Sequence, residues 1–218
     1  CTDLGGNNYA VVTIGNQTWM AENLKYLPSV VGPGTGSYTT AYYYVYDYNG
    51  TDVTAAKATA NYDTYGVLYN WPAAMDGSSS SSSNPSGVQG VCPAGWHLPS
   101  DDEWKELEMA LGMSQAEADD TDWRGTNEGS KLAGNAGLWC DDDLEENPEF
   151  GSSGFTALPG GFCNVSNFIY VGYGGDWWSA TVNFTNITWN RSLDYANSEV
   201  NRFSLNKGMG FSVRCLRD

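Results

Sequence analysis

The residues best suited to chemistry lie in and just before the stretch 174–218, and their types favour ligand recognition over bond breaking. Aromatic side chains offer large contact area at low entropic cost, and Asn, Ser and Asp offer adaptable hydrogen bonds, as in antibody paratopes. Rings beside amides and carboxylates also suit sugars, so the pattern does not choose between a protein and a glycan ligand. The ligand-binding candidates are Tyr170, Tyr173, Phe184, Asn186, Trp189, Asn190, Ser192, Asp194, Asn197, Asn201, Phe203, Ser204 and Asn206.

The stretch 174–218, which we call the ligand-display ribbon, alternates as antiparallel β-strands do. Turn signals at 196–198 and 208–210 divide it, and a further strand is expected over 211–215. The inward face should hold Arg191, Leu193 and Val200, and the outward face Phe184, Asn186, Asn190, Ser192, Asp194, Asn201 and Phe203. Trp189 is ambiguous, because alternation places it inward with Leu193 whereas its type suits a binding surface.

The sequence contains few residues in patterns typical of a catalytic site. The only histidine, His97, lies between Trp96 and Leu98 before a helix cap, which favours a structural role over that of a general base. Acidic runs at 119–122 and 141–146 could flank a glycosidic bond, although such runs are usually solvated loops. We therefore predict that the protein is not an enzyme, and keep a polysaccharide-active enzyme as the third alternative.

The same acidic runs permit calcium, which prefers carboxylate and carbonyl oxygens. Neither run fits the DxDxDG calcium loop with its distal Glu, and the sequence lacks the GluProAsn, GlnProAsp and TrpAsnAsp signatures of sugar binding through calcium. We predict no metal and no cofactor, with calcium as the alternative.

Five cysteines bear on the compartment of the protein. As a first residue, Cys1 matches the lipid-bearing cysteine of a processed bacterial lipoprotein. The alternative is that a domain boundary happens to fall at this cysteine. The other four lack the CxxC spacing of zinc and redox sites, and they allow three pairings. We favour disulfides between Cys92 and Cys215 and between Cys140 and Cys163. Buried free thiols are the alternative.

Local signals predict the remaining elements. A hairpin is expected over 9–24, a short helix or turn at 52–58, and a flexible serine-rich loop at 78–86. Capping boxes at Ser100 with Glu103 and at Ser114 with Glu117 predict helices over 100–112 and 114–119. The net charge of -16 excludes nucleic acid as a partner, and no apolar stretch is long enough to span a bilayer.

Six blocks in this order, IGNQTWMAENLK, YGVLYNW, CPAGWHLPSDDEW, SGFTALPGGF, WWSAT and GFSVRCLRD, resemble the Fibrobacter succinogenes major paralogous domain family of bacterial surface domains. That family is similar to the formylglycine-generating-enzyme branch of the C-type lectin fold. The resemblance implies a single α+β domain over 1–218, with antiparallel strands, one or two helices and much irregular loop. Enzymes of that branch use a cysteine pair near the C-terminus, whereas Cys215 stands alone here, so their activity is not carried over.

The ribbon also resembles the variable region of proteins diversified by retroelements, in which adenine-directed mutagenesis rewrites chosen codons. The resemblance implies that Asn, Tyr, Ser, Asp and Phe positions vary while WWSAT and GFSVRCLRD stay constant. A plain solvent-facing ribbon is the alternative. We therefore expect an extracellular or cell-surface bacterial binding domain, adhesin-like and perhaps at a pilus tip, with a protein or glycan ligand on another cell or host surface. A structural filament or pilus subunit is the second alternative.

Overall fold

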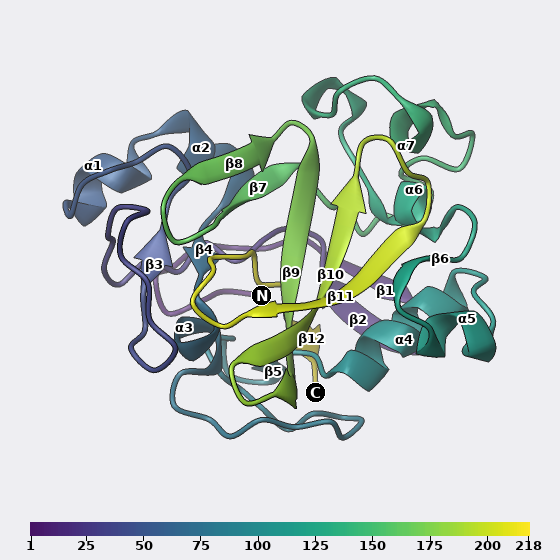
Figure 1. Ribbon diagram of the computed structural model, residues 1–218, viewed down its shortest axis with the longest axis horizontal. Helices are drawn as coiled ribbons and strands as arrows, with labels where there is room; N and C mark the ends of the chain where they lie inside the picture. Colours follow the sequence, from purple (N-terminus) through teal and green to yellow (C-terminus); the bar gives the residue numbers. More distant parts are fainter.

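The ligand-display ribbon forms the centre of a six-stranded sheet (Figure 1) in the computed structural model, which describes residues 1–218. The strands are β6 (Asp122–Arg124), β7 (Gly160–Cys163), β8 (Phe168–Val171), β9 (Gly174–Phe184), β10 (Ile187–Asp194) and β11 (Val200–Asn206). Their order in the sheet is β6-β11-β10-β9-β7-β8, and every pairing is antiparallel except that of β7 with β9. The two predicted strands either side of the 196–198 turn, β10 and β11, are therefore confirmed.

A second sheet joins the two ends of the chain. It contains β1 (Val11–Ile14), β2 (Gln17–Met20), β5 (Trp96–His97) and β12 (Leu216–Arg217), in the order β1-β2-β12-β5. The expected hairpin is β1–β2, and the pairing of Leu216 with Trp19 links N- and C-terminal strands. The strand expected over 211–215 is wrong, because this extended segment makes only isolated bridges, to Tyr69 and Trp177. A third, two-stranded sheet pairs β3 (Tyr43–Tyr44) with β4 (Leu68–Tyr69).

Seven short α-helices replace the one or two that were predicted. They are α1 (Val53–Lys57), α2 (Ala60–Tyr65), α3 (Trp71–Met75), α4 (Asp101–Ala110), α5 (Gln115–Asp119), α6 (Glu128–Leu132) and α7 (Asp143–Glu146), with a 3-10 turn at Ala136–Leu138. Both predicted capping boxes are present, at the starts of α4 and α5. The short helix or turn expected at 52–58 is α1, whereas α2, α3, α6 and α7 were not predicted because helices of four to six residues are too short to show a hydrophobic period. No helix is long and apolar enough to cross a membrane.

The two adjacent tryptophans of β9 tie the sheet into two hydrophobic clusters. Neighbouring residues of a strand point to opposite faces. Trp178 therefore packs with Phe211 and Val213 in one cluster, whereas Trp177 packs with Trp104 and other residues in a second. Both rings are almost completely buried, which confirms that the WWSAT block belongs to the core. The chain is a single α+β domain in which β9 runs between the two clusters.

Helix α4 is attached to β10 by buried ion pairs. Arg191 lies on the inward face as predicted, with its Nη1 2.7 Å from Asp101 Oδ1 and its Nε 2.6 Å from Glu108 Oε1. Arg202 Nη2 lies 2.7 Å from Asp101 Oδ2, and Arg124 Nη2 lies 2.6 Å from Glu108 Oε2. These contacts hold β6, β10 and β11 against one helix, so the inner face of the sheet is fixed by charge as well as by apolar packing.

His97 also serves to join elements. Its two ring nitrogens lie 2.8 Å from Glu103 Oε1 of α4 and 2.7 Å from Asp218 Oδ1. Burial lowers the pKa of His97, but the hydrogen bonds and charges of these two carboxylates raise it more, so that the net shift is upward. The imidazole therefore connects β5 to the start of α4 and to the end of the chain.

One of the two favoured disulfides is present. Cys92 and Cys215 are bonded, whereas the predicted bond between Cys140 and Cys163 is wrong. Cys163 is buried on β7 beside Tyr44 and Leu68, and Cys140 contacts Tyr173, so the two thiols have different neighbours. The alternative of free thiols holds for this pair.

The serine-rich segment 78–86 contains no helix or strand. Part of it is bound to the end of β9: Ser80 Oγ donates to the Ala180 carbonyl, and Thr181 Oγ1 donates to the Ser81 carbonyl. These bonds give the middle of the segment a defined course along β9, whereas its flexibility stays a prediction.

Candidate functional site

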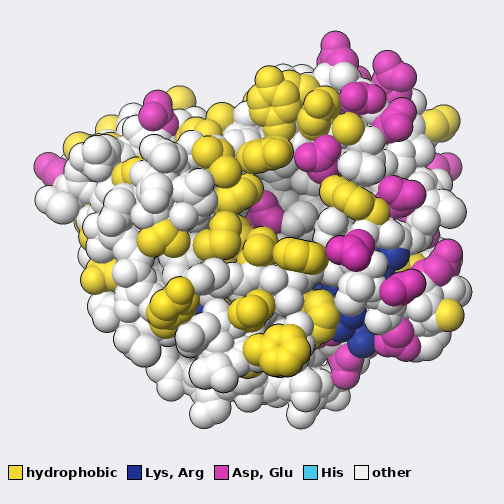
Figure 2. Space-filling view, viewed as in Figure 1, with side chains coloured by type: hydrophobic (Ala, Val, Ile, Leu, Met, Phe, Trp, Pro, Cys, Tyr) yellow, Lys and Arg dark blue, Asp and Glu magenta, His cyan; other side chains and the backbone are white.

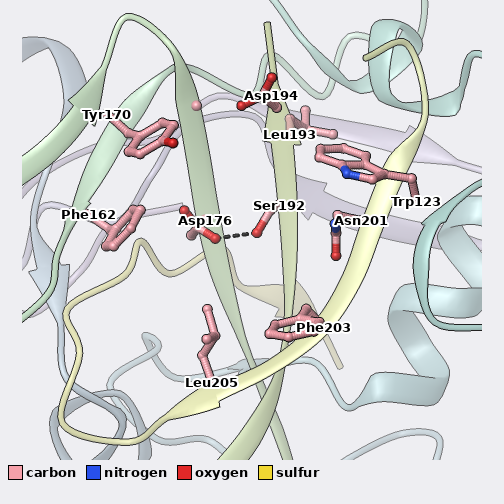
Figure 3. A pocket seen from close by; sticks show the side chains of 11 residues that line it. Trp123, Phe162, Tyr170, Asp176, Ser192, Leu193, Asp194, Asn201, Phe203 and Leu205 are labelled. Carbon is pink, nitrogen blue, oxygen red and sulfur yellow. Dashed lines mark hydrogen bonds between the residues drawn. The ribbon is translucent and has the colours of Figure 1, made fainter. Parts of the chain in front are cut away.

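A hollow of 190 Å³ lies on the outer face of the six-stranded sheet, opposite α4 (Figure 3). It forms because small side chains occupy the centre of β9, β10 and β11 while large ones stand around them. The central group consists of Gly174, Asp176, Ser192 and Asn201. The surrounding group consists of Trp123, Phe162, Tyr170, Leu193, Asp194, Phe203 and Leu205. Figure 2 shows the hollow on this face, bordered by hydrophobic side chains and with an acidic side chain at its floor.

The floor is a small hydrogen-bonded group. Strand register places Ser192 opposite Asp176 on one side and opposite Asn201 on the other. The Ser192 hydroxyl donates to Asp176 Oδ1, and Asn190 Nδ2 lies 3.2 Å from the same oxygen and 3.1 Å from Ser192 Oγ. The side-chain oxygens of Asn190 and Asn201 are buried and have no hydrogen-bond partner. Buried polar atoms in proteins are normally paired, so these two acceptors are exceptions, and Asn201 is the one of the two that lines the hollow.

Aromatic rings make the rim. Tyr170 is 51% exposed, Phe203 45% and Trp123 37%, which is unusual for rings placed so near one another. Phe162 stacks on Tyr170 with ring centroids 5.8 Å apart. Tyr170 has φ 72°, a left-handed conformation that costs a non-glycine residue about 1–3 kcal/mol. Asp122, which precedes Trp123, has φ 63°. Backbone strain therefore accompanies two of the rings that border the hollow.

Asp176 is the electrostatic centre of the hollow. Burial raises the pKa of its carboxyl to about 7, and the charge of Asp194 acts in the same direction. The hydrogen bonds from Ser192 and Asn190 oppose this shift without cancelling it. No Lys, Arg or His lines the hollow, so nothing on this face compensates the charge that Asp176 carries above neutral pH.

Asp176→Asn should stabilise the protein at high pH. The pKa of the carboxyl is raised from 3.8 to about 7 on folding, so its contribution to stability is complete below pH 4 and is lost as the pH rises through 7. An amide keeps the shape and the acceptor oxygen but does not ionise. We expect the free energy of unfolding of the variant to exceed that of wild type by about 1–3 kcal/mol at pH 8.

Urea denaturation of both proteins at pH 4 and pH 8 would measure this difference. The gain at pH 8 should shrink towards zero at pH 4. An equal gain at both values would mean that the effect is not ionisation of Asp176.

A shelf of tyrosines adjoins the hollow. Tyr173 packs edge-on against Tyr195, with centroids 5.2 Å apart, and against Tyr170, with centroids 6.5 Å apart. These rings, with Ile169 and Asp194, border a second depression of 470 Å³ that shares Tyr170 and Asp194 with the hollow. The two depressions together make a continuous aromatic and acidic surface.

The sequence of the chain matches one known protein family. The family model described as Fibrobacter succinogenes major domain matches residues 12–217, which is nearly the whole chain. The chain belongs to this family. No curated protein and no solved structure matches it. In this Fibrobacter succinogenes major domain, the matched region contains every residue of the hollow and of the tyrosine shelf.

Some of the ligand-binding residues predicted for this Fibrobacter succinogenes major domain lie together at the hollow, and others lie elsewhere. Those at the hollow are Tyr170, Ser192, Asp194, Asn201 and Phe203, and Tyr173 is on the shelf. Phe184 and Asn186 lie at the β9–β10 turn, and Asn197 lies in the turn before β11. Ser204 pairs with Asn183, and Asn206 Nδ2 donates to the Tyr38 hydroxyl.

Two candidates need correction. Asn190 was expected to face outward, but it is fully buried, because Trp178 and Phe203 are its partners on the neighbouring strands and their rings are much larger than its amide. Trp189 lies on the Arg191 side of β10, with the guanidinium of Arg202 3.8 Å from its ring centroid. Alternation was therefore the better guide, and Trp189 does not line the hollow.

Six residues of the hollow were not nominated from the sequence as ligand-binding: Trp123, Phe162, Gly174, Asp176, Leu193 and Leu205. Trp123 reaches the rim because β6 pairs with β11, which sets Trp123 opposite Asn201. One signal was available for Asp176, since it is an acidic residue directly before the Trp pair of a buried strand. A carboxylate in that position needs partners or a function.

The acidic runs at 119–122 and 141–146 form no candidate metal centre. No group of three or more His, Cys, Asp or Glu side chains is placed to hold a metal ion. The absence of a metal stays a prediction, with calcium binding as its alternative, and a calcium titration tests it.

Proposed function

We propose that this protein is an extracellular ligand-binding domain of a bacterial surface, adhesin-like, whose binding site is the hollow on the outer face of β9, β10 and β11. The observation that carries the proposal is the combination of half-exposed rings with a polar floor made of Asp176, Ser192 and Asn201. Rigid aromatic groups around a few converging polar groups are the usual composition of a ligand site. The strained backbone of Tyr170 supports the same view, since such strain gathers at functional sites.

We further propose that the fold is C-type-lectin-like. Pairing of β2 with β12, the position of α4 against the sheet and the long irregular loops support it. The bond between Cys92 and Cys215 supports an oxidising, extracellular compartment, because disulfides are rare in the cytosol. A protein or glycan on another cell or host surface is the partner that we propose, with a lipid on Cys1 or a pilus as the means of attachment.

Retroelement diversification remains part of the proposal. Ser192, Asn201 and Phe203 are of the types that adenine-directed mutagenesis produces, and all three line the hollow. A reverse-transcriptase gene and a near-copy of the 3′ end in the neighbouring DNA are expected. A locus with neither would contradict diversification and leave the binding site as proposed.

Phe203→Ala should abolish binding to a ligand selected from a glycan and host-protein array. Truncation of a hot-spot residue costs an interface about 2 kcal/mol or more, which is about 30-fold in affinity. Phe184→Ala is the matched control, since Phe184 is 66% exposed on the same sheet but lies outside the hollow. Both variants should melt within a few degrees of wild type.

The two variants separate the hollow from the β9–β10 turn. Equal binding by wild type and Phe203→Ala, with loss in Phe184→Ala, would move the site to that turn and refute the proposal.

Cleavage of a bound polysaccharide is a second candidate function, favoured by one observation. A carboxyl whose pKa is raised to about 7 has the property that a general acid needs near neutral pH. Product analysis of the array glycans after overnight incubation tests it. Turnover that disappears in Asp176→Asn would place this function above simple binding.

A further inference from the structure

The floor of the hollow contains a carboxyl group with one oxygen left for a ligand. The Ser192 hydroxyl and the Asn190 amide both donate to Asp176 Oδ1, so Asp176 Oδ2 is the free carboxyl oxygen. Asn190 is fully buried behind the floor residues Asp176 and Ser192 and does not line the hollow. A positively charged donor would pair with the free oxygen of Asp176.

The charge of the hollow has one sign. Asp176 and Asp194 are its acidic residues, Tyr170 is its only other titratable residue, and no basic side chain lines it. The nearest arginine in the strands, Arg191, points to the opposite face, where Asp101 and Glu108 bind it. A cation entering the hollow would therefore meet two carboxyl groups and no competing positive charge.

The rim suits a cation as well. Trp123, Tyr170 and Phe203 present rings around the opening, and the faces of such rings attract ammonium groups by their quadrupole. Sites that bind organic ammonium ions have this composition, with carboxylates at the floor and aromatic rings around the opening. A sugar hydroxyl is less well matched to this site, because it brings no positive charge to compensate the two carboxyl groups.

We propose that the hollow binds a primary ammonium group carried on an aliphatic stem, such as the end of a lysine side chain. An ammonium group has a positive charge, three donors and no acceptor, which matches the two carboxyl groups of Asp176 and Asp194. The inference rests on the proposed function and names the ligand chemistry of that same site. An amino sugar carries the same group, and the experiment below separates the two sources.

Binding should tighten as the pH rises. The pKa of Asp176 is about 7, so only about 3% of the carboxyl is ionised at pH 5.5, and nearly all of it at pH 8.5. An alkylammonium group stays charged over this range. Because apparent affinity scales with the competent fraction, the dissociation constant should fall about 30-fold between these two values.

The probe is Nα-acetyl-lysine methylamide, titrated into the full chain and followed by the side-chain amide NMR signals of Asn190 and Asn201. Its Nε-acetylated form is the neutral control. Glucosamine oligosaccharides and their N-acetylated forms make the second pair, measured at pH 7. Asp176→Asn removes the central charge, and Asp47→Asn removes an equal charge at an exposed site outside the hollow.

The expected result is binding of the charged probes only, with affinity reduced at least 10-fold in Asp176→Asn and unchanged in Asp47→Asn. The stronger of the two charged probes identifies the source. Equal binding of the acetylated forms, no binding of either charged probe at 20 mM, or unchanged affinity in Asp176→Asn would overturn the inference. In those cases the proposed function survives if array ligands still need Phe203, and both fail if no ligand does.

Discussion

Replacing Arg191 by methionine should lower the free energy of unfolding by about 3–5 kcal/mol, because it leaves two buried carboxylates short of their main counter-charge. Arg191 bridges Asp101 and Glu108, and all three side chains are at most 6% exposed. Burial alone would raise the pKa of Asp101, but Arg191 and Arg202 lower it below its usual value. Without Arg191 the protein must keep a poorly paired charge in a low-dielectric interior or take up a proton.

Urea denaturation followed by tryptophan fluorescence at pH 7 measures this loss. Lys105→Met is the matched control: Lys105 also pairs with Asp101, but its other partners, Asp102 and Asp119, are 54% exposed. Such exposed pairs contribute about 0–1 kcal/mol. If Arg191→Met lowers the free energy of unfolding no more than Lys105→Met does, the buried ion pairs do not hold α4 to the sheet.

Removal of the Cys92–Cys215 bond is the second change with a large expected effect. The double variant Cys92→Ala with Cys215→Ala should lose about 2–5 kcal/mol, since the bond closes a loop with a sequence separation of 123 residues and its loss enlarges the unfolded ensemble. Both cysteines are buried in the larger hydrophobic cluster, so the substitution also removes some packing.

Denaturation with and without reductant separates these two contributions. Dithiothreitol should destabilise wild type and leave the double variant unchanged. Cys140→Ala, which removes a free thiol, should respond to reductant as wild type does. Wild type that is equally stable with and without reductant would contradict a stabilising role for the bond.

Local sequence signals predicted the elements that depend on neighbouring residues. Ser100 and Ser114 each cap a helix because the Glu three residues later completes a reciprocal pair, which needs no tertiary information. Alternation in β10 and β11 likewise assigned Arg191 and Val200 to the inner face. These signals were sufficient for β10, β11 and the helix beneath them.

Alternation gives the face of a residue but not its depth. Asn190 and Ser192 share the outer face of β10, yet Asn190 is fully buried while Ser192 remains accessible. The difference comes from the cross-strand partners, which are Trp178 and Phe203 for Asn190 but Asp176 and Asn201 for Ser192. Such partners lie 9 to 16 residues away, and register fixes them only after folding.

The rest of the hollow depends on long-range contacts that local sequence signals do not predict. Trp123 arrives through β6, about 80 residues before its partner strand, and Phe162 through the parallel neighbour of β9. The free thiols of Cys140 and Cys163 have the same explanation, because spacing carries no information on which cysteines fold together.

The central claim is that ligand binds in the hollow, and two indole N–H signals test it most directly. Trp123 is at the rim of the hollow, whereas Trp189 is on the opposite face beside Arg202. On addition of the array-selected ligand to ¹⁵N-labelled protein, the Trp123 indole signal should shift and the Trp189 signal should stay. A shift of Trp189 with Trp123 unchanged would place binding on the other face of the sheet and contradict the claim.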